Sequence, residues 1–156
     1  MNRLILPLTI MVALVLAMLP MPLKLDVFRP DWVSLVLIYW IMATPHKINV
    51  GIAWLVGLVL DVLLGSTLGV HALALAIIAY LVALNFQKIR TYSVWQQGLI
   101  VMFLICAKLL LVYWVEHITN RVQLPPGYFW PVLTSGLMWL WCFPVLRKIR
   151  RRFRIR

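Results

Sequence analysis

The chain has 156 residues, of which 64% are hydrophobic and only 12% are charged, and its mean hydropathy is +0.97. This composition excludes an ordinary soluble globular domain, which is about half apolar and a quarter charged. Fifteen lysines and arginines against four acidic residues give a net charge of +11, which suits either a nucleic-acid binder or the cytoplasmic face of a membrane protein. The two cysteines, Cys106 and Cys142, both lie in apolar runs, which argues against a disulfide framework or a paired-cysteine zinc site.

The first apolar run covers residues 4–19. A hydrocarbon core of about 30 Å requires about 20 helical residues, so this run predicts a membrane helix. It follows a short basic head, but its end lacks the small residues of a signal-peptide cleavage site, and we expect it to stay uncleaved. Pro20 and Pro22 then end the helix, because proline removes a backbone donor.

Five more apolar runs follow. The second, residues 30–43, is short, so we expect either a locally thinned bilayer or shielding by neighbouring helices. The others cover residues 50–64, 70–84, 94–118 and 128–146. Lipid offers no partner to open backbone groups, and the runs lack the alternation of a β-barrel. The sequence therefore predicts a single all-α membrane domain over residues 1–156, with about six transmembrane helices.

Lysine and arginine predict the orientation of this domain, because they are enriched in short cytoplasmic loops. If the N-terminus is cytoplasmic, most cations fall on the cytoplasmic side, including a basic tail at residues 147–156. The opposite side holds only Lys24, Arg29 and Arg121. We therefore predict that both termini are cytoplasmic.

Gly57, Asp61, Gly65 and Gly69 follow one another at intervals of four residues. If the third span continues to Gly65, the first three share one helix face. The fourth span carries its own stripe of small residues, which are Ala72, Ala76, Ala79 and Ala83. Small residues let membrane helices approach closely, so we expect spans three and four to pack as a tight hairpin.

Asp61 needs a separate explanation, because a charge inside hydrocarbon is costly and defaults to a functional hypothesis. Lys108, near the middle of the fifth span, is a candidate partner for an ion pair. Three roles stay open: a structural ion pair or hydrogen-bond node, part of a binding interface, or proton or ion transport. One acid and one base do not make a proton relay, which places transport last.

The basic tail carries cations with apolar residues at helical spacing between them; the cations up to residue 154 are Arg147, Lys148, Arg150, Arg151, Arg152 and Arg154. Such a segment can lie on an anionic lipid surface. The first interpretation, however, is that the tail fixes the topology and holds the last span in register, and contact with a cytoplasmic partner that has an acidic face comes second. Nucleic acid is not expected, since no aromatic platform or recognition motif accompanies the charge.

Enzyme motifs are weak in this sequence. Ser66 is displaced by one position from the serine of a nucleophile elbow, and no strand precedes it. His46 falls on the predicted cytoplasmic side, whereas His71 and His117 fall on the outer side, so they cannot form one zinc site. No phosphate-binding glycine loop occurs at a strand-to-helix junction. We therefore expect no catalytic, cofactor or metal residues.

Several stretches together resemble the family of rod shape-determining proteins MreD of Gram-negative bacteria. They are Phe28-Arg29-Pro30-Asp31-Trp32, Leu37-Ile38-Tyr39-Trp40, Pro45-His46 and the region from Gly57 through Asp61 to Leu73. The resemblance covers nearly the whole chain and is most specific from Arg29 to Leu84, whereas Lys108 departs from the family pattern. It implies a six-helix fold similar to the substrate-binding subunits of energy-coupling vitamin transporters.

The resemblance further implies a non-enzymatic inner-membrane subunit of the rod complex, which elongates the side wall and maintains cell shape. Its implied partners are an MreC-like periplasmic scaffold, an MreB-like filament, and a RodA-like glycosyltransferase with its transpeptidase. We hypothesise that the hairpin around Asp61 organises a helix-docking surface, while the tail contacts anionic lipid or the filament side.

A small-molecule binding or transport subunit with an outward-facing pocket is the alternative. It would use polar residues of the outer side, which are Asp31, Ser66, Thr67, His71 and Glu116.

Overall fold

The computed structural model describes residues 4–154. Within these residues the chain forms seven α-helices and no strand: α1 (Ile5–Met18), α2 (Leu23–Asp26), α3 (Trp32–Ala43), α4 (Val50–Leu64), α5 (Val70–Thr91), α6 (Val94–Asn120) and α7 (Trp130–Arg152). The all-α prediction is confirmed, and six of the helices match the six predicted runs. The short α2 was not predicted.

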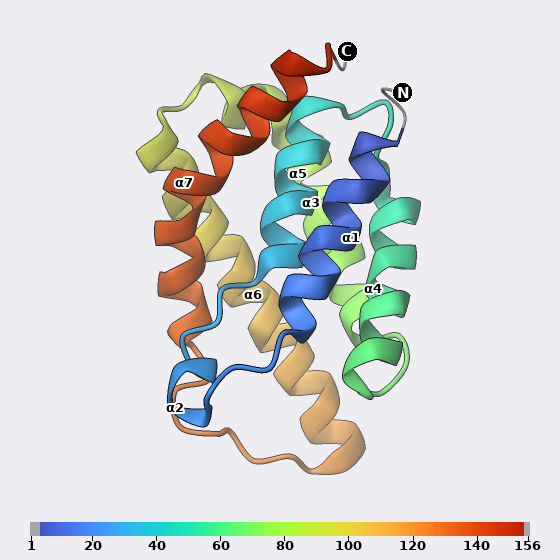
Figure 1. Cartoon of the computed structure of the whole chain (residues 1–156). Coiled ribbons are helices and arrows are strands. Elements are labelled where there is room, and N and C mark those ends of the chain that lie inside the picture. Colours follow the sequence, from blue (N-terminus) through green and yellow to red (C-terminus); the bar gives the residue numbers. More distant parts are fainter. Residues whose placement is uncertain (1–3, 155–156) are drawn as a thin grey trace.

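Helix α3 lies at the centre of the bundle, surrounded by α1, α5, α6 and α7 (Figure 1). Every residue from Val33 to Met42 is buried. Twelve residues rise only about 18 Å, which is short for a membrane span. Neighbouring helices shield this short helix, which agrees with one of the two alternatives predicted for it, a thinned bilayer being the other. Helix α4 is peripheral and packs mainly on α5, with a smaller contact to α1.

Helices α5, α6 and α7 are long and apolar enough to cross a membrane, whereas α1, α3 and α4 are apolar but shorter. Two helices continue by more than one turn past the predicted spans. Helix α5 runs to Thr91 and α7 runs to Arg152. Most of the predicted basic tail is therefore a direct extension of the last helix.

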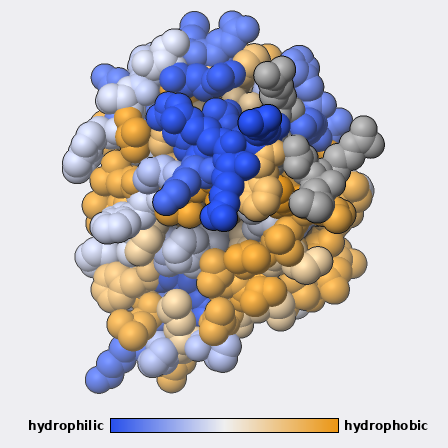
Figure 2. All heavy atoms as spheres, turned by 45° about the horizontal axis from the view of Figure 1, so that its top comes forward, coloured by the Kyte–Doolittle hydropathy of each residue, from blue (hydrophilic) through white to orange (hydrophobic). Residues whose placement is uncertain are grey.

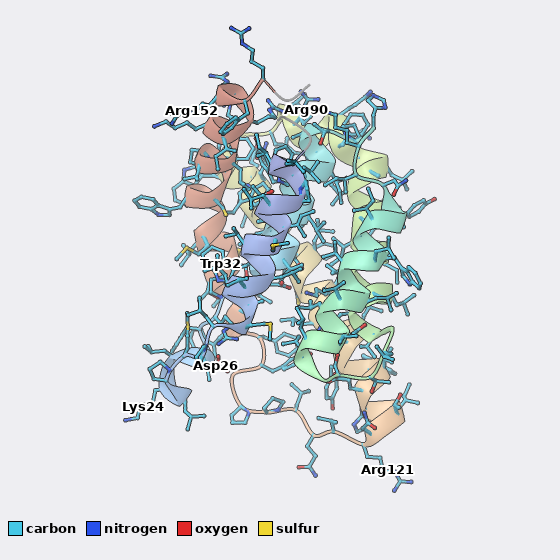
Figure 3. The ribbon with its side chains drawn as sticks, turned by 45° about the vertical axis from the view of Figure 1, so that its right-hand side comes forward. Lys24, Asp26, Trp32, Arg90, Arg121 and Arg152 are labelled. Carbon is cyan, nitrogen blue, oxygen red and sulfur yellow. The ribbon has the colours of Figure 1, made fainter. Side chains whose placement is uncertain are left out.

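The two ends of the bundle differ in charge. The start of α1 and the end of α7 lie at one end, and α2 and the loop after α6 lie at the other (Figure 1). Arg90 and Arg152 mark the first end, whereas Lys24, Asp26 and Arg121 mark the second (Figure 3). Hydrophilic side chains gather where α7 ends, and hydrophobic ones form a belt beside them (Figure 2). We call the first end the basic end and the second the α2 end.

Candidate functional site

Helices α4 and α5 meet in a tight hairpin whose turn depends on two glycines. Gly65 has φ 65° and Gly69 has φ 98°, a left-handed conformation that side chains rarely adopt. About two helical turns before Gly65, the backbones of the two helices touch. A Cβ atom at Gly57 would lie 2.3 Å from the Cα atom of Ala72. The two small residues therefore set how closely the helices approach.

The carboxylate of Asp61 is fully buried and caps the N-terminus of α5. Its Oδ2 atom accepts from the amide nitrogens of Gly69 at 2.9 Å and Ala72 at 3.3 Å. Its Oδ1 atom accepts from the amide nitrogen of His71 at 3.0 Å and from Ser66 Oγ at 2.8 Å. The first amides of a helix have no partner within that helix and carry partial positive charge. Asp61 supplies both the acceptors and the negative charge.

The ring of His71 completes this node. Its Nδ1 atom lies 2.8 Å from Asp61 Oδ1 and 3.3 Å from Ser66 Oγ. A neutral imidazole with hydrogen on Nδ1 donates to the carboxylate without a second charge. The candidate pair of Asp61 with Lys108 is wrong, because the donors around Asp61 belong to the turn and the start of α5.

Lys108 instead pairs with Asp31, at the start of α3. Lys108 Nζ lies 2.5 Å from Asp31 Oδ2 and donates to Ser34 Oγ at 3.0 Å. Asp31 is also the N-cap of α3, where its Oδ1 accepts from the amide nitrogen of Ser34. The Asp31 amide donates to Ser135 Oγ at 2.9 Å. This second node connects the buried α3 to both α6 and α7.

Arg29 forms a third polar contact near the α2 end. Its guanidinium donates to the carbonyl oxygens of Ala17 and Leu19, where α1 ends, and lies 2.7 Å from a carboxylate oxygen of Asp26. The last carbonyls of a helix lack partners within it and carry partial negative charge. Arg29 therefore caps α1 from the segment that leads into α3.

The residues proposed for an outward-facing pocket are largely engaged in these contacts. Ser66 and His71 bond to Asp61, and Asp31 bonds to Lys108. Thr67 Oγ1 accepts from the side chain of Asn120 at 3.0 Å. Residues 4–154 contain no group of three or more His, Cys, Asp or Glu side chains placed to hold a metal ion.

A family model described as rod shape-determining protein MreD matches residues 1–149 of this chain. The chain belongs to the MreD family. It is 38% identical over 144 residues to the rod shape-determining protein MreD of Haemophilus influenzae, an alignment that covers 92% of this chain and 89% of the relative. No solved structure matches the chain. The predicted family is confirmed, and with it a role in rod shape determination for a bacterial membrane protein.

The structure separates the residues that the sequence singled out in this MreD-family chain. Gly57, Asp61 and Ala72 meet in the α4–α5 hairpin, with Gly65 and Gly69 at its turn. Further along α5, Ala76 and Ala83 of the stripe are half-buried and Ala79 is buried. Lys108 belongs to the other node. The tail cations lie on the last turns of α7 and just beyond; of these, Arg150 is half-buried and the others are exposed.

An apolar groove runs between α6 and α7. It has a volume of about 530 Å³, and its walls include Trp95, Leu99, Trp130 and Leu137. Gly98 lies in its floor, where a Cβ atom would come within 3.5 Å of the carbonyl oxygen of Gly136. Sequence reasoning did not find this groove.

Proposed function

We propose that the chain is a non-enzymatic membrane subunit of the rod complex, which helps maintain rod shape by linking the scaffold, the filament and the peptidoglycan synthases. Membership of the MreD family supports the general role. The observation that carries the finer proposal is the engagement of Asp61, His71, Asp31 and Lys108 in contacts that hold helices together. Since these polar residues hold helices together, the surfaces left for partners are the apolar sides of the bundle and its basic end.

We propose that six helices cross the bacterial inner membrane with the basic end in the cytoplasm. The charge distribution supports this orientation, because cytoplasmic segments of membrane proteins are rich in lysine and arginine. The short helices α1, α3 and α4 would cross together with their longer neighbours, which shield α3 from lipid. Similarity to vitamin-binding transporter subunits stays a prediction.

The proposed docking surface is the outer face of α4. Leu55, Val59 and Val62 are exposed there at spacings of four and three residues, which place them on one helix face. A membrane helix of a partner could pack along such a row. The occupant that we propose is the single membrane helix of an MreC-like scaffold. Gly57 and Asp61 would act indirectly, by fixing the position of α4 on α5.

The basic end is the proposed contact for anionic lipid and for the MreB-like filament side. Its exposed cations include Arg147, Lys148 and Arg151 on the last turns of α7. Each cation near an anionic surface contributes about 1 kcal/mol to attraction. A helix that continues out of the bundle holds these charges in a fixed array.

Site-specific photo-crosslinking in living cells tests the docking surface. A photoreactive phenylalanine analogue at Val59 reports on the outer face of α4, and the same analogue at Leu137 reports on the α6–α7 groove. We expect the scaffold to crosslink at position 59 and not at position 137. Crosslinking of the scaffold only at position 137 would move the docking site to the groove. If neither position crosslinks to any rod-complex protein, neither the outer face of α4 nor the α6–α7 groove is a docking site.

A further inference from the structure

A small cavity lies at the basic end, between the ends of α3, α5 and α7 and the first turns of α6. Its volume is about 170 Å³. Two of its walls carry arginines, namely Arg90 from α5 and Arg147 and Arg150 from α7. Tyr39 from α3 and Gln97 from α6 also line it. Side chains from four helices therefore converge on one site.

The charges around this cavity are of one sign. The four acidic residues of the sequence are Asp26, Asp31, Asp61 and Glu116, and all lie in the half of the bundle toward the α2 end. The salt bridges in residues 4–154 involve Arg29, His71 and Lys108 as the basic partners. The cavity arginines thus form a cluster of positive charge for which the described fold supplies no carboxylate.

Two buried polar atoms of the cavity residues also lack partners within the described chain. Tyr39 and Gln97 are each only 2% exposed, and neither Tyr39 Oη nor Gln97 Oε1 makes a hydrogen bond. The orientation of the Gln97 amide is fixed, since its Nε2 donates to the carbonyl oxygens of Ile89 at 3.0 Å and Tyr92 at 3.2 Å. Buried polar groups without a partner are rare and need an explanation. The residues that line the cavity therefore include a hydroxyl donor and an amide acceptor without partners, beside three guanidinium groups.

We propose that this cavity binds a phosphate ester that carries a free hydroxyl group, such as the glycerophosphate headgroup of an anionic lipid. Phosphate oxygens match the planar guanidinium groups of Arg90, Arg147 and Arg150 and can accept from the Tyr39 hydroxyl. A hydroxyl of the glycerol donates to Gln97 Oε1. Apolar Met42, Ala43 and Phe143 complete the lining, which suits a site at the border between headgroups and acyl chains.

The proposal goes beyond general attraction of the tail to lipid and does not depend on a role in the rod complex. It predicts that the arginines of the cavity differ from other arginines of α7. Arg152 and Arg154 lie outside the cavity, so they provide a control with the same change in charge. Tyr39→Phe removes a single hydroxyl and keeps the ring contact with Phe143.

The test measures lipid binding to the purified full-length chain in detergent, by native mass spectrometry and by thermal stabilisation. The probes are phosphatidylglycerol, phosphatidylcholine and soluble glycerol 3-phosphate. We expect phosphatidylglycerol to bind more tightly than phosphatidylcholine. Arg147→Gln with Arg150→Gln should weaken this binding about tenfold or more, because charged hydrogen bonds are lost. Tyr39→Phe should weaken it by a few-fold, and Arg152→Gln with Arg154→Gln by less than about twofold.

Equal weakening by the two double variants would overturn the proposal, because it would show adsorption through charge alone. Absence of any preference for phosphatidylglycerol or glycerol 3-phosphate over phosphatidylcholine would also overturn it. Saturable binding of glycerol 3-phosphate that competes with the lipid would support the site and assign it to a soluble phosphate ester. Selective binding of the lipid alone would support the site and assign it to a headgroup.

Discussion

The amide nitrogen of Gly69 lies 2.9 Å from Asp61 Oδ2, so a carboxylate near the end of α4 closes the first turn of α5. This contact accounts for a charged residue in an apolar helix. The positive end of α5, two side-chain donors and the tight turn around Gly65 together surround the carboxylate. Asp61 is therefore a positioning residue for the hairpin in this account.

Asp61→Asn should destabilise the protein by about 2 kcal/mol. The side-chain NH2 group of asparagine would replace one carboxylate oxygen, and it cannot accept hydrogen bonds from the donors that this oxygen bonds in the wild type. Unfolding with SDS in mixed micelles measures this change. Glu116→Gln is the matched control, since Glu116 lies on the same half of the bundle outside the Asp61 node. Equal stability of Asp61→Asn and the wild type would show that the cap contributes nothing.

Gly57→Ala should separate α4 from α5, because the added methyl group would overlap the backbone of Ala72. Overpacking of this kind costs about 1–3 kcal/mol. The same unfolding assay applies, with Gly51→Ala as control. A Cβ atom at Gly51 meets only the side chain of Asn49, at 3.3 Å. If both variants lose the same stability, close approach at Gly57 is not the cause.

Lys108→Met should destabilise the bundle by about 3 kcal/mol, because it leaves the Asp31 carboxylate without its cation. Adding Asp31→Asn should recover much of this loss, so the two changes are coupled. Lys108→Met and Asp61→Asn should instead add to within about 0.5 kcal/mol. The double-mutant cycles distinguish the observed pair from the pair that the sequence suggested. Coupling of Lys108 to Asp61 but not to Asp31 would contradict the structure.

Cysteine labelling tests the orientation. In a chain with Cys106 and Cys142 replaced by alanine, Thr91→Cys lies at the basic end and Val122→Cys lies in the loop after α6. A membrane-impermeant maleimide added to intact spheroplasts should label position 122 and reach position 91 only after lysis. The reverse pattern would place the basic end outside, against the expectation for cationic segments.

The bundle itself was largely predictable from sequence, because apolar runs bounded by proline, glycine and charge define membrane helices. The hairpin was also predictable, because Gly57 and Ala72 are small residues on consecutive helices and small residues allow close packing. The ends of the helices were less predictable from the sequence. Helix α5 continues through Lys88 and Arg90, which hydropathy alone assigns to a loop.

The partners of the buried charges were not predictable in the same way. Opposite charge suggested Lys108 as the partner of Asp61. The observed partners of Asp61 include backbone amides at the start of the next helix, and backbone groups leave no pattern in the sequence. The N-cap role of Asp31 could be found locally in the sequence. Aspartate is a preferred N-cap residue, and its carboxylate accepts from the amide nitrogen three residues later, which here is that of Ser34. The bond of Asp31 to Lys108 joins residues 77 positions apart, and only the packing of α3 against α6 determines it.

Affinity purification shows whether this chain works as an adaptor within the rod complex. The chain is tagged at its N-terminus in its own bacterium, extracted gently, and its partners are identified by mass spectrometry against an unrelated tagged membrane protein. We expect enrichment of the scaffold, the filament protein and the wall synthases. Recovery of a transporter energising module or a stoichiometric solute in their place would contradict this adaptor role.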